Sequence, residues 1–465
     1  MAGAIDIDLT KGPIGTHFRT LAIPAALGMF FNTAYNIVDI FFAGMLGTSA
    51  QAGLALGFQA FFVPMSVGVG LGAAMGGLVG NALGAGQRPR ARRLAAQGIS
   101  FGVVVALVLM LVGSLVGPAL IDLVSEPGSA YRADGRRYYL LLSLALPAFL
   151  LAFGCNGILQ AHGDSLSMQR AMMVAFFVNC GLNPLMVFGL PGVIPGLGFD
   201  GLAGSTLVSQ YGVMAYLILQ VLRRRNMAQV RWAHFKPRTD KFREIAVQAL
   251  PRAVTMLVMI LSAFVVQFAL KSFGEHAVAG YGIAIRLEQM LLLPVLGMTG
   301  ALLPIVAQNF GARSHDRVRE AVFFCWKVGL VITLCSVPVL WLFGRLFLSA
   351  FTDDAEVIRV GLAYLRVDSV ILPFYMMLFS IDSLLQGLKR PGWSIWISLY
   401  RQAFGVAFFV WVFIRVFGFS EIGVWFGIAC AVVTGWGLAM MLASRVAGAE
   451  IGGLWRGRQP VAKAL

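Results

Sequence analysis

The stretch PAALGMFFNTAYNIVDIFFAGMLG, residues 24–47, is an apolar run long enough to cross a bilayer, and it contains one carboxylate, Asp39. A charge at that depth costs about 3 kcal/mol on insertion scales. Asn32, Tyr35 and Asn36 precede Asp39 at spacings that place all four residues on one face of a helix. The stretch therefore predicts a membrane-spanning helix with an apolar lipid-facing surface and one polar stripe that faces a protein interior.

Two interpretations of this polar stripe stay open. Amide and hydroxyl side chains in a span can form interhelical hydrogen bonds that only hold the bundle together. A carboxylate differs from an amide because it can change its charge, and this difference favours a functional role for Asp39.

The composition places the whole chain in the membrane. Of its 465 residues, 58% are hydrophobic and 12% are charged, whereas a soluble domain carries about 25% charged residues. The net charge of +15 lies mainly in short loops between apolar runs. Basic loops of this kind orient a membrane protein and contact anionic lipid, so we expect lipid and not nucleic acid as the partner of these charges.

The five cysteines are scattered through apolar runs without C-x-x-C spacing, so we expect neither disulfides nor a metal site. Residues before Thr20 are polar and mixed in charge, and no A-x-A site follows a short apolar core. We therefore expect no cleavable signal peptide and a first span that is retained as an anchor.

Twelve apolar segments have about the length that a span needs. Their expected limits are 20–45, 52–83, 96–122, 138–160, 168–190, 199–222, 246–271, 278–307, 321–349, 361–387, 393–416 and 421–444. If the N-terminus is cytoplasmic, the cytoplasmic segments contain 24 Lys and Arg residues and the outside loops contain 7. This asymmetry predicts that both termini are cytoplasmic.

The second half of the chain repeats the first at an offset of 227 residues. Pro24 corresponds to Pro251, and Gly47 corresponds to Gly274. Because each half has six spans, an even number, the first helix of each half enters the membrane from the same side. The sequence therefore predicts an all-α protein with two parallel six-helix repeats. The expected organisation is an N-terminal lobe (1–222), a basic cytoplasmic linker (223–245), a C-terminal lobe (246–446) and a cytoplasmic tail (447–465). Two six-helix bundles are typical of an alternating-access transporter.

The second span contains glycines at every fourth position, at Gly68, Gly72, Gly76, Gly80 and Gly84. Such a ridge lets a neighbouring helix approach closely. It serves either static packing or sliding between states, and the sequence does not separate the two. Prolines inside several spans remove backbone hydrogen bonds and permit bending.

Four sequence motifs resemble the multidrug and toxic compound extrusion (MATE) family. They are GMLGTSAQAG (44–53), GNALGAG (80–86), FGEHAVAGYGIAIR (273–286) and PIVAQNFGA (304–312). The resemblance covers essentially the whole chain. It implies a monomeric antiporter of the bacterial cytoplasmic membrane, not an enzyme, that exports cationic and aromatic organic compounds. Inward flow of H⁺ or Na⁺ would drive it, with no cofactor and no bound metal.

The resemblance is closest to the DinF-like branch, which uses a polar cluster in its N-terminal lobe. Asp39 and Tyr35 match the acid and the tyrosine of its first helix. Asn179 and Asn183 match the polar pair of its fifth helix, and Thr206 matches the threonine of its sixth. An aspartate is common in that branch where this chain has Asn183, so a strong Na⁺ site is not expected here.

The second half offers a further polar cluster, Arg286, Glu288 and Asp382, as a second coupling or substrate-binding site. Arg286 is expected to pair with Asp382 or Asp368, and such pairing could be purely structural. Another bacterial branch of the family uses a glutamate on helix 7 and an aspartate on helix 10. Helix 7 of this chain has no acid after Pro251, so a Na⁺ site of that kind is not expected.

The working hypothesis is that Asp39 carries the coupling proton. Burial favours its neutral form, whereas hydrogen bonds from Tyr35, Asn36, Asn179 and Thr206 would favour the anion. Two alternatives remain. A flippase for lipid-linked precursors belongs to the same superfamily, and a membrane-embedded enzyme would need clustered catalytic groups, although no H-E-x-x-H or nucleophile motif is found.

Overall fold

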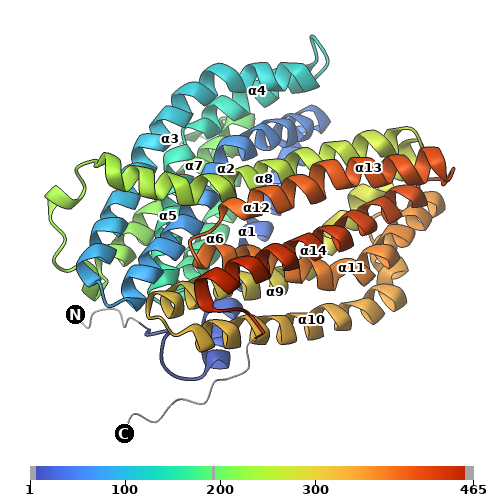
Figure 1. The fold of residues 1–465 in the computed structure, drawn as a ribbon. Coiled ribbons are helices and arrows are strands. Elements are labelled where there is room, and N and C mark those ends of the chain that lie inside the picture. The colour runs from blue at the N-terminus through green and yellow to red at the C-terminus, as the bar shows by residue number, and fades with distance from the viewer. Residues whose placement is uncertain (1–6, 191–193, 456–465) are drawn as a thin grey trace, which may run out of the picture. The chain divides into compact units, whose positions relative to one another are not determined.

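The computed structural model describes residues 7–190 and 194–455, and almost all of them are helical (Figure 1). The first half contains α1 (Ile14–Leu46), α2 (Thr48–Gly84), α3 (Arg88–Val124), α4 (Ala130–Ser143), α5 (Leu146–Ala161), α6 (Leu166–Phe188) and α7 (Phe199–Leu222). The second half contains α8 (Thr239–Lys271), α9 (Glu275–Gly311), α10 (His315–Ser349), α11 (Ala355–Gly387), α12 (Gly392–Ser398), α13 (Val406–Trp411) and α14 (Ile422–Ile451). The short elements are the strands β1 (Gly189–Leu190) and β2 (Ile194–Pro195), the 3₁₀ turns η1 (Arg225–Met227) and η2 (Trp232–His234), and the π-helical segments η3 (Leu399–Gly405) and η4 (Val412–Val416).

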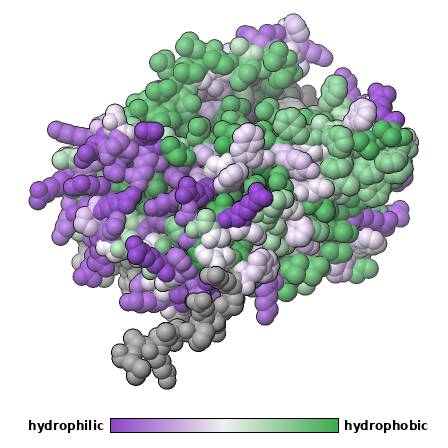
Figure 2. Space-filling model, viewed as in Figure 1, coloured by the Kyte–Doolittle hydropathy of each residue, from purple (hydrophilic) through white to green (hydrophobic). Residues whose placement is uncertain are grey.

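The twelve predicted spans are confirmed within the described residues. Eleven helical spans are long and apolar enough to cross a membrane, and the α4–α5 pair supplies the twelfth as one span bent by 52°. The bend falls just before Pro147, at the start of α5, where proline lacks the N–H that a continuous helix would need. Hydrophobic side chains cover large parts of the visible surface (Figure 2), and residues such as Leu123 and Phe268 are more than four-fifths exposed, as expected for side chains that face lipid.

The repeat predicted from the sequence also appears in the helix boundaries. Both ends of α9 lie 227 residues after the corresponding ends of α2. The chain forms two compact units, one of residues 1–8 and 27–253, and the other of 9–26 and 254–465. The two breaks, at 26 and 253, are again 227 residues apart and follow Pro24 and Pro251.

This division differs from the predicted lobe boundaries. The first part of α1 belongs to the second unit, and the first part of α8 belongs to the first unit. The physical reason is that both helices are long and contain a proline, so each half of the helix packs with a different bundle. The predicted tail, 447–465, overlaps the end of α14, and residues 456–465 lie outside the described part.

The glycine ridge of α2 is a packing surface for α5. A Cβ placed on Gly72 would stand 2.8 Å from the carbonyl oxygen of Phe153, and one placed on Gly157 of α5 would overlap the carbonyl oxygen of Gly72. A Cβ on Gly68 would also crowd Phe153. The two backbones therefore meet directly, as predicted for small residues at a helix interface.

The predicted linker is tied to α3 of the first unit. The side chain of Gln97 donates to the backbone carbonyl oxygens of His234 (2.6 Å) and Lys236 (2.8 Å) and accepts from the backbone N–H of Arg238 (3.0 Å). Arg92 adds a hydrogen bond of 2.9 Å to the carbonyl oxygen of Asn226. These bonds fix the path of the linker over α3.

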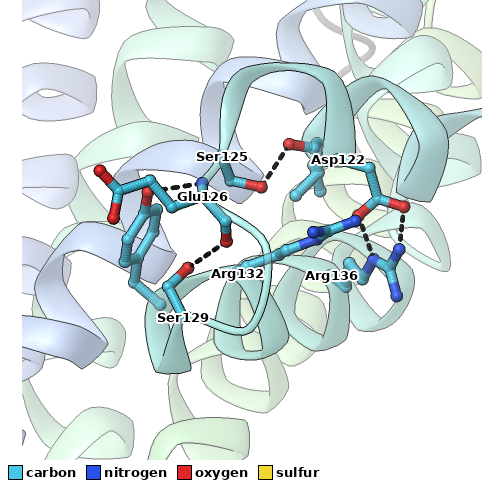
Figure 3. A network of polar contacts seen from close by, with 8 residues as sticks. Asp122, Ser125, Glu126, Ser129, Arg132 and Arg136 are labelled. Carbon is cyan, nitrogen blue, oxygen red and sulfur yellow. Dashed lines mark hydrogen bonds and ion pairs between the residues drawn. The ribbon is translucent and has the colours of Figure 1, made fainter.

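A polar network joins α3 to α4 at the start of the bent fourth span (Figure 3). Arg132 Nε donates to Asp122 Oδ1 at 2.8 Å, and Arg136 donates to both carboxylate oxygens of Asp122. Asp122 is about one-quarter exposed, so solvent screening limits the strength of the pairs. The Glu126 carboxylate, in the loop that follows α3, points away from both arginines in Figure 3.

We expect Asp122→Ala to destabilise the protein by about 1 kcal/mol, because two arginines on α4 lose their shared partner. Glu126→Ala is the control, since it removes a nearby carboxylate, in the loop after α3, that does not bond to either arginine. The measurement is the unfolding temperature of each variant in detergent. Equal unfolding temperatures for the two variants would show that the Asp122 network does not stabilise the α3–α4 connection.

Candidate functional site

Three helices of the first unit bring a polar cluster around Asp39. Asp39 lies on α1, Asn179 and Asn183 lie one turn apart on α6, and Thr206 lies near the start of α7. A spacing of four residues puts both asparagines on one face of α6, directed at the same carboxylate. All four residues are buried, and Asn179 and Asn183 have no exposed surface.

The hydrogen bonds of this Asp39 cluster cover both oxygens of the carboxylate. Asn179 Nδ2 donates to Asp39 Oδ1 at 3.1 Å, and Asn183 Nδ2 donates to the same oxygen at 2.8 Å. Thr206 Oγ1 donates to Oδ2 at 3.3 Å. Asn183 Nδ2 also lies 3.0 Å from Asn179 Oδ1, so the two amides support one another.

Ser205 extends the cluster by one residue that the sequence reasoning missed. Its hydroxyl donates to Asn183 Oδ1 and lies 2.9 Å from the carbonyl oxygen of Leu202. By accepting this bond, the Asn183 carbonyl fixes the amide flip, so that Nδ2 points to Asp39. The serine directly before Thr206 in the sequence was the available signal.

Tyr35 and Asn36 differ from the expected arrangement. Tyr35 is buried one turn before Asp39, but its hydroxyl makes no hydrogen bond with the residues that the structure describes. Asn36 is partly exposed, and its amide donates to the carbonyl oxygen of Asn32 at 2.8 Å, within its own helix. The expected hydrogen bond from Asn36 to Asp39 is therefore wrong, because a residue three positions away on α1 is turned enough to leave the buried face.

The chemistry of the cluster suits a small cation. In the hydrogen bonds described above, Asp39 is the one carboxylate, and its partners are neutral amide and hydroxyl groups. Such a site can hold a proton on the carboxylate. It can also turn amide and hydroxyl oxygens toward a monovalent metal ion, but with a single negative charge.

Within the second predicted cluster (Arg286, Glu288 and Asp382), Arg286 and Glu288 are not brought together. Arg286 is exposed whereas Glu288 is buried, because residues two apart point to opposite sides of a helix. Glu288 accepts a hydrogen bond of 2.5 Å from Tyr364, and its acidic neighbour is Asp368. No ion pair links Arg286 to either aspartate within the described residues.

Comparison with known proteins decides the family. The MatE family model matches residues 24–185 and 251–411, one match in each repeat. The chain belongs to the MatE family. Its members are membrane transporters, so the resemblance expected from the sequence motifs is confirmed, whereas the branch within the family is not assigned.

Curated relatives of this MatE protein are distant. A protein named FAD transporter from Shewanella oneidensis is 26% identical over 397 residues, covering 84% of this chain and 86% of that protein. A probable multidrug resistance protein, NorM, from Thermotoga maritima is 23% identical and covers 68% and 67% of the two chains. A MOP superfamily transporter from Pyrococcus furiosus has a solved structure that matches with a TM-score of 0.87, at 22% identity over 96% of this chain and 99% of that one. That likeness supports the fold of two six-helix repeats.

Proposed function

We propose that this MatE protein is a secondary antiporter that exports hydrophobic organic cations in exchange for protons by alternating access. The observation that carries the proposal is the buried Asp39 carboxylate, held by donors from α6 and α7. Multidrug relatives such as NorM support the substrate class. Both termini are proposed to be cytoplasmic, the protein to be monomeric and the location to be the bacterial cytoplasmic membrane.

The proposed cycle depends on the charge of Asp39. The ionised carboxylate accepts three hydrogen bonds, which link α1 to α6 and α7. A proton arriving from outside neutralises the carboxylate and weakens these charge-assisted bonds. Helix α1 is then free to bend near Pro24, and the outward-facing state releases its substrate. A gradient of one pH unit contributes about 1.4 kcal/mol per proton to this cycle.

Proton coupling is favoured over Na⁺ coupling by the charge of the cluster. A Na⁺ ion at Asp39 would have one anionic ligand, and Asn183 is bonded in an orientation that presents its N–H group to the carboxylate. A proton needs no further ligands. Na⁺ remains the alternative coupling ion in the test below.

A second candidate substrate is FAD. The Shewanella oneidensis relative that carries this name matches most of both chains. FAD is an anionic dinucleotide, so a site that binds FAD and a site that binds an organic cation need side chains of opposite charge. The two substrates are therefore separated by a direct transport measurement.

The experiment uses purified protein in liposomes with either ethidium or FAD as substrate. A pH gradient or a Na⁺ gradient is imposed at clamped membrane potential, and the movement of each compound is followed. The proposal predicts ethidium movement with the pH gradient alone. If only FAD moved, the proposed substrate class would be wrong. If movement required Na⁺, the proposed coupling ion would be wrong. If neither compound moved, the proposed function would be contradicted and the flippase alternative would be favoured.

We expect Asn183→Asp to introduce Na⁺ dependence into the same assay. The substitution replaces an N–H donor by a second carboxylate beside Asp39, and two buried anions need a cation between them. Transport at a given pH gradient should fall by about tenfold without Na⁺ and recover when Na⁺ is added. An Asn183→Asp variant that remains indifferent to Na⁺ would contradict the assignment of this position to the cation site.

A further inference from the structure

Two carboxyl groups of neighbouring helices are buried in the second unit. Glu288 of α9 and Asp368 of α11 lie close enough for their charges to interact, and both side chains are more than nine-tenths buried. Glu288 accepts a hydrogen bond from the Tyr364 hydroxyl at 2.5 Å. The proposed transport cycle does not use either acid.

Of the two acids, Asp368 has fewer groups that could stabilise a negative charge. Its residue is 1% exposed, and neither carboxylate oxygen has a hydrogen-bond partner among the described residues. A buried ionised carboxylate needs donors or a paired cation. A carboxyl group that keeps its proton is neutral and can donate a hydrogen bond to the neighbouring acid.

Aromatic side chains pack around Tyr364, the residue that donates to Glu288. The Tyr364 ring lies 5.1 Å from the Tyr281 ring and 5.0 Å from the Trp425 ring, measured between centroids. Trp425 is 1% exposed, and its Nε1 is another polar atom without a hydrogen-bond partner in the described part of the chain. The Trp425 donor and the Asp368 acceptors could therefore form hydrogen bonds that the described residues do not supply.

The charged and titratable groups around the pair come from each element packed against α11. Helix α9 contributes Glu288 and Tyr281, and α11 contributes Tyr364, Asp368 and Tyr375. The π-helical segment η3 contributes Arg401, whose guanidinium lies 5.5 Å from the centroid of the Tyr375 ring and whose charge reaches Glu288. Helices α14 and α10 contribute indole groups, Trp425 and Trp341. Arg366 of α11 stacks on Trp341 but is exposed, so Arg401 is the less exposed cation among these groups and accompanies two buried acids.

We propose that Glu288 and Asp368 form a second proton-binding site, independent of the Asp39 cluster, and that it gives the antiporter two coupled protons per cycle. Arg401 balances the charge of one carboxylate, and a proton balances the other. For a monovalent cation leaving the cell, two protons entering carry one net positive charge inward. This stoichiometry rests on the proposed function, whereas the proton-binding site itself does not.

The surrounding backbone gives the site a route to a conformational change. Pro373 follows Asp368 by five residues in α11 and leaves the helix without one backbone hydrogen bond. Arg401 belongs to a π-helical segment, a local geometry that is frequent at functional sites. The equivalent of α11 in the first repeat is the bent α4–α5 pair, so the two helices already differ in straightness. A change of charge at Asp368 therefore occurs close to Pro373, where α11 lacks a backbone hydrogen bond and can bend.

The site is tested first by infrared difference spectroscopy of the purified protein between neutral and alkaline pH. The wild type is expected to show a carbonyl stretch of a protonated, buried carboxyl group that is lost in Asp368→Asn and altered in Glu288→Gln. The band should persist in Asp39→Asn, which reports on the other cluster, and in Glu275→Gln, which removes an exposed acid from α9. A band that is unchanged in both Asp368→Asn and Glu288→Gln would overturn the proposal.

Stoichiometry is tested by the accumulation ratio of ethidium in liposomes at clamped zero potential and a gradient of one pH unit. Each coupled proton contributes about a tenfold ratio, so the limit is about 100-fold for the wild type and about tenfold for Asp368→Asn. Equal ratios for the two proteins would contradict the second coupled proton. A wild type that shows the infrared band but no transport would reject the proposed function and keep the proton site.

Discussion

Asp39→Asn is expected to abolish ethidium movement driven by a pH gradient in liposomes. The substitution removes the one carboxylate of the Asp39 cluster and keeps its shape, so the site can no longer change charge. At a gradient of one pH unit, each coupled proton supplies about 1.4 kcal/mol, or about a tenfold accumulation, and the variant should lose this driving force. Initial rates of dye movement, compared with protein-free liposomes, are the measurement.

The Asp39→Asn protein should still fold. The asparagine oxygen can accept the hydrogen bonds that Asn179 and Asn183 now donate to Asp39 Oδ1, and its amide can donate to the Thr206 hydroxyl oxygen. Exchange of ethidium at equal pH on both sides should therefore persist. Glu126→Gln, which removes a carboxylate from the α3–α4 loop, is the control and should transport like the wild type. Transport by Asp39→Asn at the wild-type rate would refute the coupling role.

Gly157→Ala is expected to destabilise the first unit strongly. Its new Cβ would overlap the carbonyl oxygen of Gly72 on α2, and a rigid backbone on each side cannot give way without separating the helices. We expect a loss of about 3 kcal/mol, at the upper end for an overpacked core. The measurement is the unfolding temperature in detergent.

Gly212→Ala is the matched control for this prediction. Gly212 is also a glycine inside a helix of the first unit, but no neighbouring atom lies within 4 Å of the position that an added Cβ would take. Alanine should therefore leave stability unchanged or raise it slightly through helix propensity. If Gly157→Ala unfolded at the same temperature as Gly212→Ala, then α2 and α5 would not depend on backbone contact at this point.

Periodicity and length were sufficient to predict the spans, the repeat and the buried pair of Tyr35 and Asp39 on one helix. The partners Asn179, Asn183 and Thr206 were expected only from the family resemblance. Tyr35 and Asp39 are buried together on α1, as a spacing of one turn predicts. Asn36 also belongs to the broad polar stripe in a helical projection, but its face has left the buried surface. A helical projection does not show how much of the polar stripe a neighbouring helix covers. Which residues at the edge of the stripe are buried could therefore be seen only in the structure.

Contacts between distant helices were harder to predict. Ser205 was missed because its role depends on the position of Asn183 on another helix. In the second unit, Glu288 was selected correctly as a buried acid, but its neighbours Tyr364 and Asp368 lie on α11, far away in the sequence. Charge alone placed Arg286 and Asp382 with Glu288, and offered Asp368 only as another partner for Arg286. A charged residue in an apolar run does not reveal which residue it faces.

Proton release on substrate binding tests the central claim, that Asp39 carries the coupling proton, most directly. Purified protein in weakly buffered detergent receives ethidium at saturating concentration, and the released protons are counted with a pH indicator. We predict that Asp39→Asn releases one proton fewer per molecule than the wild type, while Glu126→Gln releases the same number as the wild type. Equal release by Asp39→Asn and the wild type would contradict the account.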